Sequence, residues 1–228
     1  MDTMFDTLLQ LPLFQGLAQE DFTNILEKVR LHFIKHKAGK VFIEAGAPCD
    51  QLVFVLSGEI TSSTTLAGSY SLIETIQAPC LIEPYSMFGM KTSYVSTYTA
   101  RTLTHTVSIS KSFVMSNLFK YDIFRLNYMN IISNRLQTLN NRLWSPIGST
   151  IEARIIGFIL NRSERPVGEK ILKIKMEELA RITNETRMSV SKALNSMQEK
   201  GLIELHRGEI FIPDAALLTD FIQPAIAQ

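Results

Sequence analysis

Polar side chains that suit contact with nucleic acid are concentrated in one short stretch of the sequence, TRMSVSK. Arg187 is long enough to fork onto the O6 and N7 atoms of a guanine, a contact worth about 1–3 kcal/mol of discrimination between bases. Ser189, Ser191 and Lys192 suit phosphate oxygens or polar base edges, which hold a protein in register on a duplex. Met188 offers only apolar contact, for example with a thymine methyl group. These residue types predict contact with the major groove of DNA.

The window from 176 to 195 meets the steric demands of two short helices that cross at a tight turn. The residue at the closest approach must be small, and it is Ala180. The turn requires a left-handed backbone, which Asn184 tolerates better than most residues other than glycine. Thr186 is placed to cap the second helix beside the DNA-contacting residues. The apolar residues that would lock the pair together are Leu179, Val190, Ala193, Leu194 and Met197. The pattern predicts a helix-turn-helix unit whose second helix meets base edges at its N-terminal end.

The sequence GLIELHRGEIFIPD follows this unit and predicts two strands around a turn. Such a hairpin makes the unit a winged variant, with His206 and Arg207 at the wing tip near the DNA backbone. The charge of the region does not by itself indicate DNA, because residues 171–210 contain seven Lys or Arg and six Glu. A helical domain that contacts protein partners therefore remains as the alternative.

Short segments rich in Val, Ile, Phe and Thr fill the sequence from residue 31 to about 112. Glycines and a proline punctuate them at turn-like intervals, which is typical of a β-sandwich or jelly-roll barrel. A short amphipathic helix is expected before these segments, since Leu17, Phe22 and Ile25 fall close to helical spacing.

A helix without Gly or Pro is predicted from Phe113 to Trp144. Its apolar residues step by three and four, which is the spacing that two helices use to pack along each other. We therefore expect this helix to pair two chains, although a helix lying on its own β-barrel is the alternative. The expected dimer interface consists of Met129, Ile132, Leu136, Leu139 and Leu143.

The sequence SPIGS after this helix is the strongest break in the region and predicts a hinge at Pro146 and Gly148. Ser149 and Glu152 have the spacing of a capping box, so a new helix should begin near Thr150.

Composition places the chain among ordinary globular proteins. Hydrophobic residues make up 46% and charged residues 20%, and the formal net charge is +1. Cys49 and Cys80 are too few to supply the four thiolates of a usual iron–sulfur cluster, so we expect free thiols and a cytoplasmic location. The apolar runs are too short to span a bilayer. Because no P-loop, G-x-S-x-G or metal-ligand cluster is found, we do not expect an enzyme.

The sequence from about residue 10 to 213 resembles the CRP/FNR family of bacterial transcription regulators. LFQGL, AGKVFIEAGAPCDQLVFVLSGEI and TNETRMSVSKALNSMQEKGLIEL carry the resemblance. It implies an α+β fold with a cyclic-nucleotide-binding-like jelly-roll barrel over 1–112, a dimerisation helix over 113–144 and a winged helix-turn-helix domain over 145–228. It also implies a homodimer, a near-palindromic DNA site and RNA polymerase as a partner.

Two departures concern the effector. In cyclic-AMP-binding members a Glu holds the ribose and an Arg-Ser pair holds the phosphate, but here Met90 stands at the position of the Glu. Tyr98 and Thr99 stand at the positions of the pair, and Arg101 lies on the wrong face of a straight strand to replace an arginine at 98. A buried phosphate without a cation loses its charge-assisted partner. We therefore expect that the protein does not bind cyclic AMP in the usual manner. Any effector pocket should involve Phe88, Gly89, Met90, Tyr98, Thr99 and Leu139.

Two other cofactors of the family are an iron–sulfur cluster and haem. The N-terminal cysteine group of the iron–sulfur members is absent. Haem stays possible, since His105, Met87, Met90 and Met115 are residue types that can be axial ligands. Several relatives carry a Glu where Met188 stands, so we expect a different half-site sequence.

Overall fold

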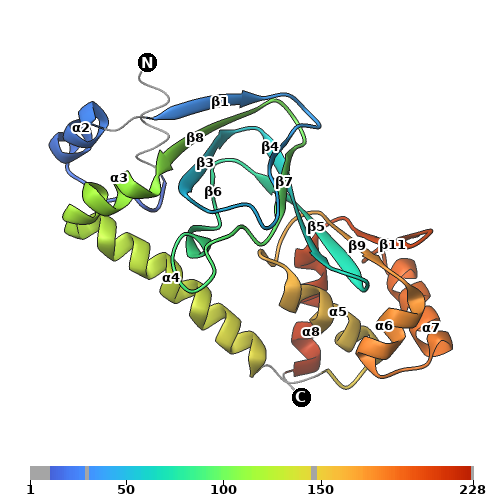
Figure 1. The fold of residues 1–228 in the computed structure, drawn as a ribbon. Coiled ribbons are helices and arrows are strands. Elements are labelled where there is room, and N and C mark those ends of the chain that lie inside the picture. Colours follow the sequence, from blue (N-terminus) through green and yellow to red (C-terminus); the bar gives the residue numbers. More distant parts are fainter. Residues whose placement is uncertain (1–10, 29–30, 145–147, 227–228) are drawn as a thin grey trace. The chain divides into compact units, whose positions relative to one another are not determined.

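The computed structural model describes residues 11–28, 31–144 and 148–226 (Figure 1). The chain divides into two compact units. The first takes in the residues up to 61 and those from 76 to 138, and the second takes in 62–75 and the residues from 139 onward. Among the described helices, none is both long enough and apolar enough to cross a membrane.

The first unit is built mainly of antiparallel strands, as the sequence predicts. One four-stranded sheet has the order β1–β8–β3–β6, and Val53 lies opposite Ser108 at its centre. In the same unit β2 pairs with β7 in antiparallel fashion, with Val41 opposite Thr99. Four consecutive residues of β3, from 52 to 55, are buried, because this central strand is covered on both faces. The strands of these pairings are β1 (His32–His36), β2 (Val41–Ile43), β3 (Gln51–Ser57), β6 (Cys80–Ile82), β7 (Thr97–Ala100) and β8 (Thr104–Ser110).

An aromatic cluster joins the helices of the first unit to its strands. The expected amphipathic helix is α2 (Gln19–Lys28), and it buries Phe22. The ring of Phe14 lies 5.7 Å from that of Phe22 and 5.6 Å from those of Phe54 and Phe124. Phe54 belongs to the central strand and Phe124 to a helix, so the cluster connects three segments far apart in the sequence.

The segment from 113 to 144 is not one continuous helix, contrary to our prediction. It contains the end of α3 (Lys111–Ser116), the 3-10 turn η2 (Leu118–Lys120) and α4 (Asp122–Leu143). Asn117 leaves the helical conformation with φ −125° and ψ −56°. The break allows Leu118 to be fully buried and Phe119 to pack beside Phe124. The burial of Leu118 and the partial burial of Phe119 outweigh the local preference for an unbroken helix.

The second unit combines four helices with strands from two distant parts of the chain. Within this unit the strands follow the order β10–β11–β9–β5–β4. Residues 70–74 of β5 pair with residues 170–174 of β9. Neither β9 nor its pairing with β5 was predicted from the sequence. The elements are the end of β4 (Glu59–Leu66), most of β5 (Tyr70–Gln77), α5 (Ile151–Arg162), β9 (Lys170–Ile174), α6 (Met176–Thr183), α7 (Arg187–Glu199), β10 (Glu204–His206), β11 (Glu209–Ile212) and α8 (Ala215–Ile226).

A buried ion pair fixes β5 to β9. Lys170 Nζ lies 2.8 Å from a carboxylate oxygen of Glu74, and the two residues are only 1% and 5% exposed. Glu74 also accepts a hydrogen bond of 2.7 Å from the backbone N–H of Glu164, while Lys170 donates one of 3.0 Å to the carbonyl of Val167. These extra bonds satisfy both charges, which a buried pair requires.

The hinge at Pro146 and Gly148 stays a prediction. Pro146 lies outside the described residues, whereas Gly148 approaches α5 so closely that an added Cβ would lie 2.3 Å from the Cβ of Ala153. The helix begins one residue later than the capping box predicts, since Thr150 is its N-cap and accepts a hydrogen bond from the N–H of Ala153.

Candidate nucleic-acid interface

The turn between α6 and α7 has the left-handed residue that the sequence predicts. Asn184 has φ 54° and ψ 47°. The next N–H, of Glu185, donates to the carbonyl of Ala180 at 2.9 Å and closes the end of α6. Ala180 is only 6% exposed, so a larger side chain there would have to displace its neighbours.

The start of α7 is capped by its own threonine. The hydroxyl of Thr186 accepts a hydrogen bond of 3.1 Å from the N–H of Ser189 and lies 2.8 Å from the hydroxyl of Ser189. Such a cap satisfies one of the donors left open at a helix N-terminus. The predicted cap is therefore present, and it fixes the direction in which the first turn of α7 projects.

The inner face of α7 packs into the core of the second unit. Leu179 of α6 and Ile155 and Ile156 of α5 belong to the same buried cluster. The predicted locking residues are all buried: Leu179, Val190, Ala193, Leu194 and Met197. The opposite face of α7 is consequently left to solvent.

The outer face of α7 carries the predicted DNA-contacting residues. Arg187 is 71% exposed in its side chain, and its Nη1 lies 3.0 Å from a carboxylate oxygen of the equally open Glu177. Met188 is 70% exposed. Lys192 is exposed, and Ser191 is half-buried. Since exposed ion pairs contribute about 0–1 kcal/mol, Glu177 can be exchanged for a stronger partner at little cost.

Two ion pairs near the helix-turn-helix turn were not predicted from the sequence. Arg154 of α5 pairs with Glu185 in the turn, with both side chains about one-quarter exposed. Glu178 of α6 pairs with Arg181 at 2.7 Å and also accepts a hydrogen bond from Ser69. The bonds from Arg181 and then from Ser69 lower the pKa of Glu178 to about 2. Ser69 lies between β4 and β5, so these contacts could not be expected from local spacing.

The wing has the geometry that the sequence predicts. β10 and β11 pair in antiparallel fashion around Arg207 and Gly208, and Gly208 has φ +80°. The side chain of His206 is 53% exposed, and its Nε2 lies 3.7 Å from a carboxylate oxygen of Glu204. Arg207 is exposed at the tip. Both residues are accessible to a large ligand such as a DNA duplex.

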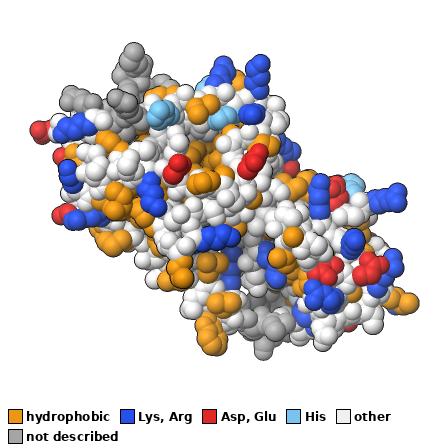
Figure 2. Space-filling view, in the orientation of Figure 1, with side chains coloured by type: hydrophobic (Ala, Val, Ile, Leu, Met, Phe, Trp, Pro, Cys, Tyr) orange, Lys and Arg blue, Asp and Glu red, His pale blue; other side chains and the backbone are white. Residues whose placement is uncertain are grey.

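The surface does not display one continuous basic field. Figure 2 shows Lys and Arg side chains interspersed with Asp and Glu over the second unit, on the face that is drawn. This matches the net charge of +1. Any recognition of DNA here must depend on the placement of individual side chains more than on overall charge.

The structure does not bring all the predicted effector-pocket residues together. Phe88 and Gly89 line a hollow of about 460 Å³ against the side of α4, beside Tyr85, Tyr128 and Ile132. Four of the six predicted residues do not line this hollow. Tyr98 is 1% exposed, Thr99 is half-buried, Met90 is fully exposed at 108%, and Leu139 belongs to the second unit.

One buried acidic residue of this region, Glu83, is absent from the predicted effector pocket. Glu83 is fully buried, and its carboxylate accepts a hydrogen bond of 3.1 Å from the hydroxyl of Tyr98. Arg101, the cation considered for this region, instead pairs with Glu59 at 3.3 Å. The sequence does contain a signal for Glu83, because this residue stands in the apolar stretch CLIEP. Charged residues are rarely buried without dedicated partners, so a Glu in such a stretch indicates a built site.

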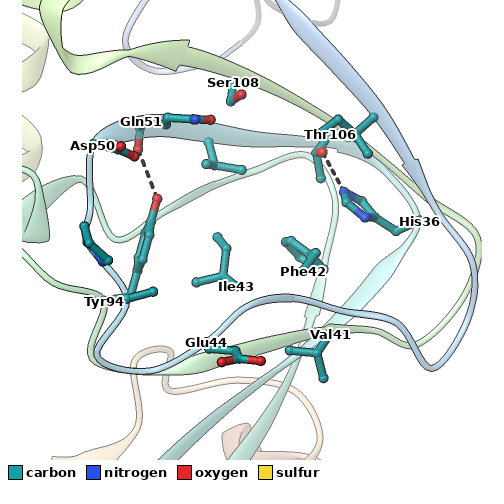
Figure 3. A pocket seen from close by; sticks show the side chains of 14 residues that line it. His36, Val41, Phe42, Ile43, Glu44, Asp50, Gln51, Tyr94, Thr106 and Ser108 are labelled. Atoms are coloured by element: carbon teal, nitrogen blue, oxygen red, sulfur yellow. Dashed lines mark hydrogen bonds between the residues drawn. The ribbon is translucent and has the colours of Figure 1, made fainter.

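A second hollow of the first unit, of about 400 Å³, lies beside β2 and strands of the four-stranded sheet (Figure 3). His36 at one end holds Thr106 through a hydrogen bond of 2.9 Å, and Tyr94 at the other donates to the carbonyl of Gln51 at 3.1 Å. Burial lowers the pKa of His36, and the charge of Lys40 lowers it further. Our pocket prediction contained none of these residues.

The residues considered as haem ligands lie in different environments. Met87 is fully buried, whereas Met90 and Met115 are exposed. His105 is half-buried, with Nδ1 2.9 Å from the hydroxyl of Ser57. Within the described residues, no group of three or more His, Cys, Asp or Glu could hold a metal ion. Cys49 and Cys80 are both buried, and no disulfide joins them.

The apolar seam of α4 is largely open in the single chain. Ile132 is half-buried against the core of the first unit, while the other four seam residues face solvent. Their exposed fractions are 57% for Met129, 67% for Leu136, 40% for Leu139 and 82% for Leu143. A helix that only covered its own barrel would bury such residues.

The helix-turn-helix domain, and the chain as a whole, are similar to known proteins. Residues 153–221 match the model of the Crp-like helix-turn-helix domain. A protein described as a CRP-like cAMP-activated global transcriptional regulator, from two strains of Mycobacterium tuberculosis, is 22% identical over 224 residues. That match covers 94% of this chain and 98% of the relative.

The crystal structure of the catabolite activator protein of Thermus thermophilus has the same fold. It is 22% identical in sequence, with a TM-score of 0.51. The match covers 92% of this chain and 97% of that one.

Proposed function

We propose that the chain is a transcription regulator of the CRP/FNR family, which acts as a homodimer and binds a near-palindromic DNA site. The observation that supports the proposal most directly is the orientation of α7. Its apolar face is buried, while Arg187 and Met188 at its first turn are exposed. A recognition helix requires this division between a packed face and a free N-terminal end.

The proposed DNA contacts divide into two kinds. Arg187 reads guanine, and Met188 makes apolar contact with a base such as thymine. Thr186, Ser189, Ser191 and Lys192 of the helix, and His206 and Arg207 of the wing, position the domain through phosphates or polar base edges. The hydroxyls of Thr186 and Ser189 already bond to each other, so these two residues should contribute less to DNA contact than the rest of the set.

The proposed dimer pairs two copies of α4 through the seam of Met129, Ile132, Leu136, Leu139 and Leu143. Two-fold symmetry then presents one recognition helix to each of two successive major grooves, about one turn of DNA apart. RNA polymerase is the partner that we expect for a regulator of this type.

We propose further that cyclic AMP is not the effector, although the Mycobacterium tuberculosis relative is described as cAMP-activated. Tyr98 stands where the resemblance places the phosphate-binding arginine, and its hydroxyl is bonded to the buried carboxylate of Glu83. A phosphate brought to this place would meet a negative charge in a medium of low dielectric, which is strongly unfavourable. A different effector would occupy the hollow beside Phe88 and Gly89.

Selection of binding sites from random-sequence DNA tests the proposal. We expect a recovered motif with two-fold symmetry and half-sites about one turn apart, and an affinity that falls steeply as salt is raised. Cyclic AMP added to the binding reaction should leave the affinity unchanged. A motif without two-fold symmetry would exclude the dimer model.

The near-neutral charge of residues 171–210 favours a second candidate, in which the helical domain contacts protein partners. The salt titration separates the two candidates. Association through phosphates releases counterions and weakens by orders of magnitude between low and moderate salt. Failure to select any DNA motif, together with weak salt dependence of residual binding, would favour the protein-contact function.

A further inference from the structure

Four hydrogen-bond donors of the first unit converge on the carboxylate of Glu83. The backbone N–H groups of Val95 and Ser96 donate at 2.8 and 2.9 Å. The hydroxyl of Ser86 donates at 2.7 Å and that of Tyr98 at 3.1 Å. Both carboxylate oxygens are used, each by one N–H and one hydroxyl.

Such a set of donors is what proteins use to bind oxyanions. Consecutive N–H groups that point into one concavity make an anion site, and bonds to a charged acceptor are stronger than bonds between neutral groups. Here Val95 and Ser96 supply the consecutive pair, while Ser86 comes from the separate turn η1 (Pro84–Ser86). The donor geometry is therefore that of a site for a carboxylate or phosphate group.

The backbone of Glu83 indicates that its side chain is required at this place. The residue has φ 35° and ψ 56°, in the left-handed region that favours glycine. A residue with a Cβ persists in that region only where surrounding structure imposes it. The residue is also fully buried, which for a carboxylate is tolerated only with full hydrogen bonding.

We propose that Ser86, Val95, Ser96 and Tyr98 form an oxyanion-binding site whose ligand is the chain's own Glu83 carboxylate. The first unit is then self-liganded at this site and takes up no external carboxylate or phosphate there. This goes beyond the proposed regulator function, since it assigns a binding site and its occupant by geometry alone.

Removal of the internal ligand provides the test. In Glu83→Ala the four donors lose their acceptor, so thermal unfolding should occur at a lower temperature than in the wild type. Added sodium acetate or formate should restore part of the stability by entering the vacated site. Acetate at ten times its dissociation constant would raise the midpoint by about 3–6 °C. Inorganic phosphate tests whether the site accepts a larger oxyanion.

The controls are the wild type and Glu83→Gln, with sodium chloride at matched ionic strength. Neither protein has a vacated site, so acetate should raise their midpoints no more than chloride does. Equal effects of acetate on all three proteins would overturn the proposal. The readout is stability, so the result does not depend on whether the protein binds DNA.

Backbone NMR keeps the proposal testable if the alanine variant does not fold. The N–H protons of Val95 and Ser96 should resonate further downfield in the wild type than in Glu83→Gln, because the amide oxygen is a weaker acceptor than the carboxylate. The same shifts in both proteins would show that these N–H groups do not bind an anion.

Discussion

Single residues of the α6–α7 turn set the geometry of the helix pair through local sterics. Ala180 is small at a close approach, and Asn184 adopts the left-handed backbone that its type tolerates. Glu83 is instead held by tertiary contacts. Its donors at 95, 96 and 98 lie 12 to 15 residues further along the chain, and only the folded strands bring them together.

At Asn184 a left-handed conformation decides the effect of substitution. Asn184→Ala should lower the free energy of unfolding by about 1–2 kcal/mol, because a Cβ without a compensating polar group is strained there. Asn184→Gly should leave stability close to that of the wild type, since glycine adopts this conformation freely. Urea denaturation of the purified proteins measures both. A loss in the glycine variant as large as in the alanine variant would contradict the argument.

Arg187 is the residue on which sequence recognition should depend most. Arg187→Ala should weaken binding to the selected site by about 1–3 kcal/mol and relax the preference for guanine at one position of each half-site. Binding to unrelated DNA should change less. Competition gel shifts give both numbers.

The matched control is Arg101→Ala, which removes an exposed arginine of the first unit that also pairs with a nearby carboxylate, that of Glu59. This variant should bind the selected site as the wild type does. Equal losses in the two variants would mean that Arg187 contributes only general charge.

Among the elements, single helices and strands were predicted more successfully than breaks within a helix or the pairing of distant strands. The strand-rich region and the two helices of the turn have the periodicity expected of them. The break at Asn117 was missed because it depends on burial of Leu118 in tertiary structure. The pairing of β5 with β9 was missed because the paired residues are 96 to 104 positions apart in the sequence, from Glu74 and Lys170 to Tyr70 and Ile174.

The ion pair between β5 and β9 should behave as a unit. Glu74→Leu leaves Lys170 buried without its partner and should destabilise the protein by about 3–5 kcal/mol. The double variant Glu74→Leu, Lys170→Met removes both charges and should recover most of that loss. Chemical denaturation of the two single variants and the double variant gives the coupling energy. Additive losses would show that the two side chains act independently.

At the scale of the whole molecule, the order of the strand-rich and helical regions can be predicted from changes in residue composition along the chain. The effector site cannot be predicted in this way. A change from β-rich segments to helical segments is visible along a chain. A pocket instead needs side chains from several segments at known distances, and the hollow beside Phe88 combines η1 with α4. Only two of the six predicted pocket residues line it, because the other predictions rested on position in the sequence and not on a fold.

Dimer formation is the property of the whole molecule that the open seam of α4 predicts. Leu136 is 67% exposed in the single chain, and in the proposed dimer it lies between two apolar surfaces. Leu136→Glu would place two carboxylates at that interface and should convert the dimer to monomers, as measured by light scattering after size exclusion. The monomer should bind the palindromic site far more weakly, because the second half-site no longer binds at the high effective concentration that dimerisation provides.

Leu103→Glu is the control, since Leu103 is a 47% exposed leucine of the first unit that lies between β7 and β8 and outside α4. It should remain dimeric and bind DNA as the wild type does. If Leu136→Glu stays dimeric while its recognition of the site is unchanged, the chains must associate through a different surface. The exposed leucines of α4 would then need another explanation, because an apolar stripe of this length is unfavourable in water.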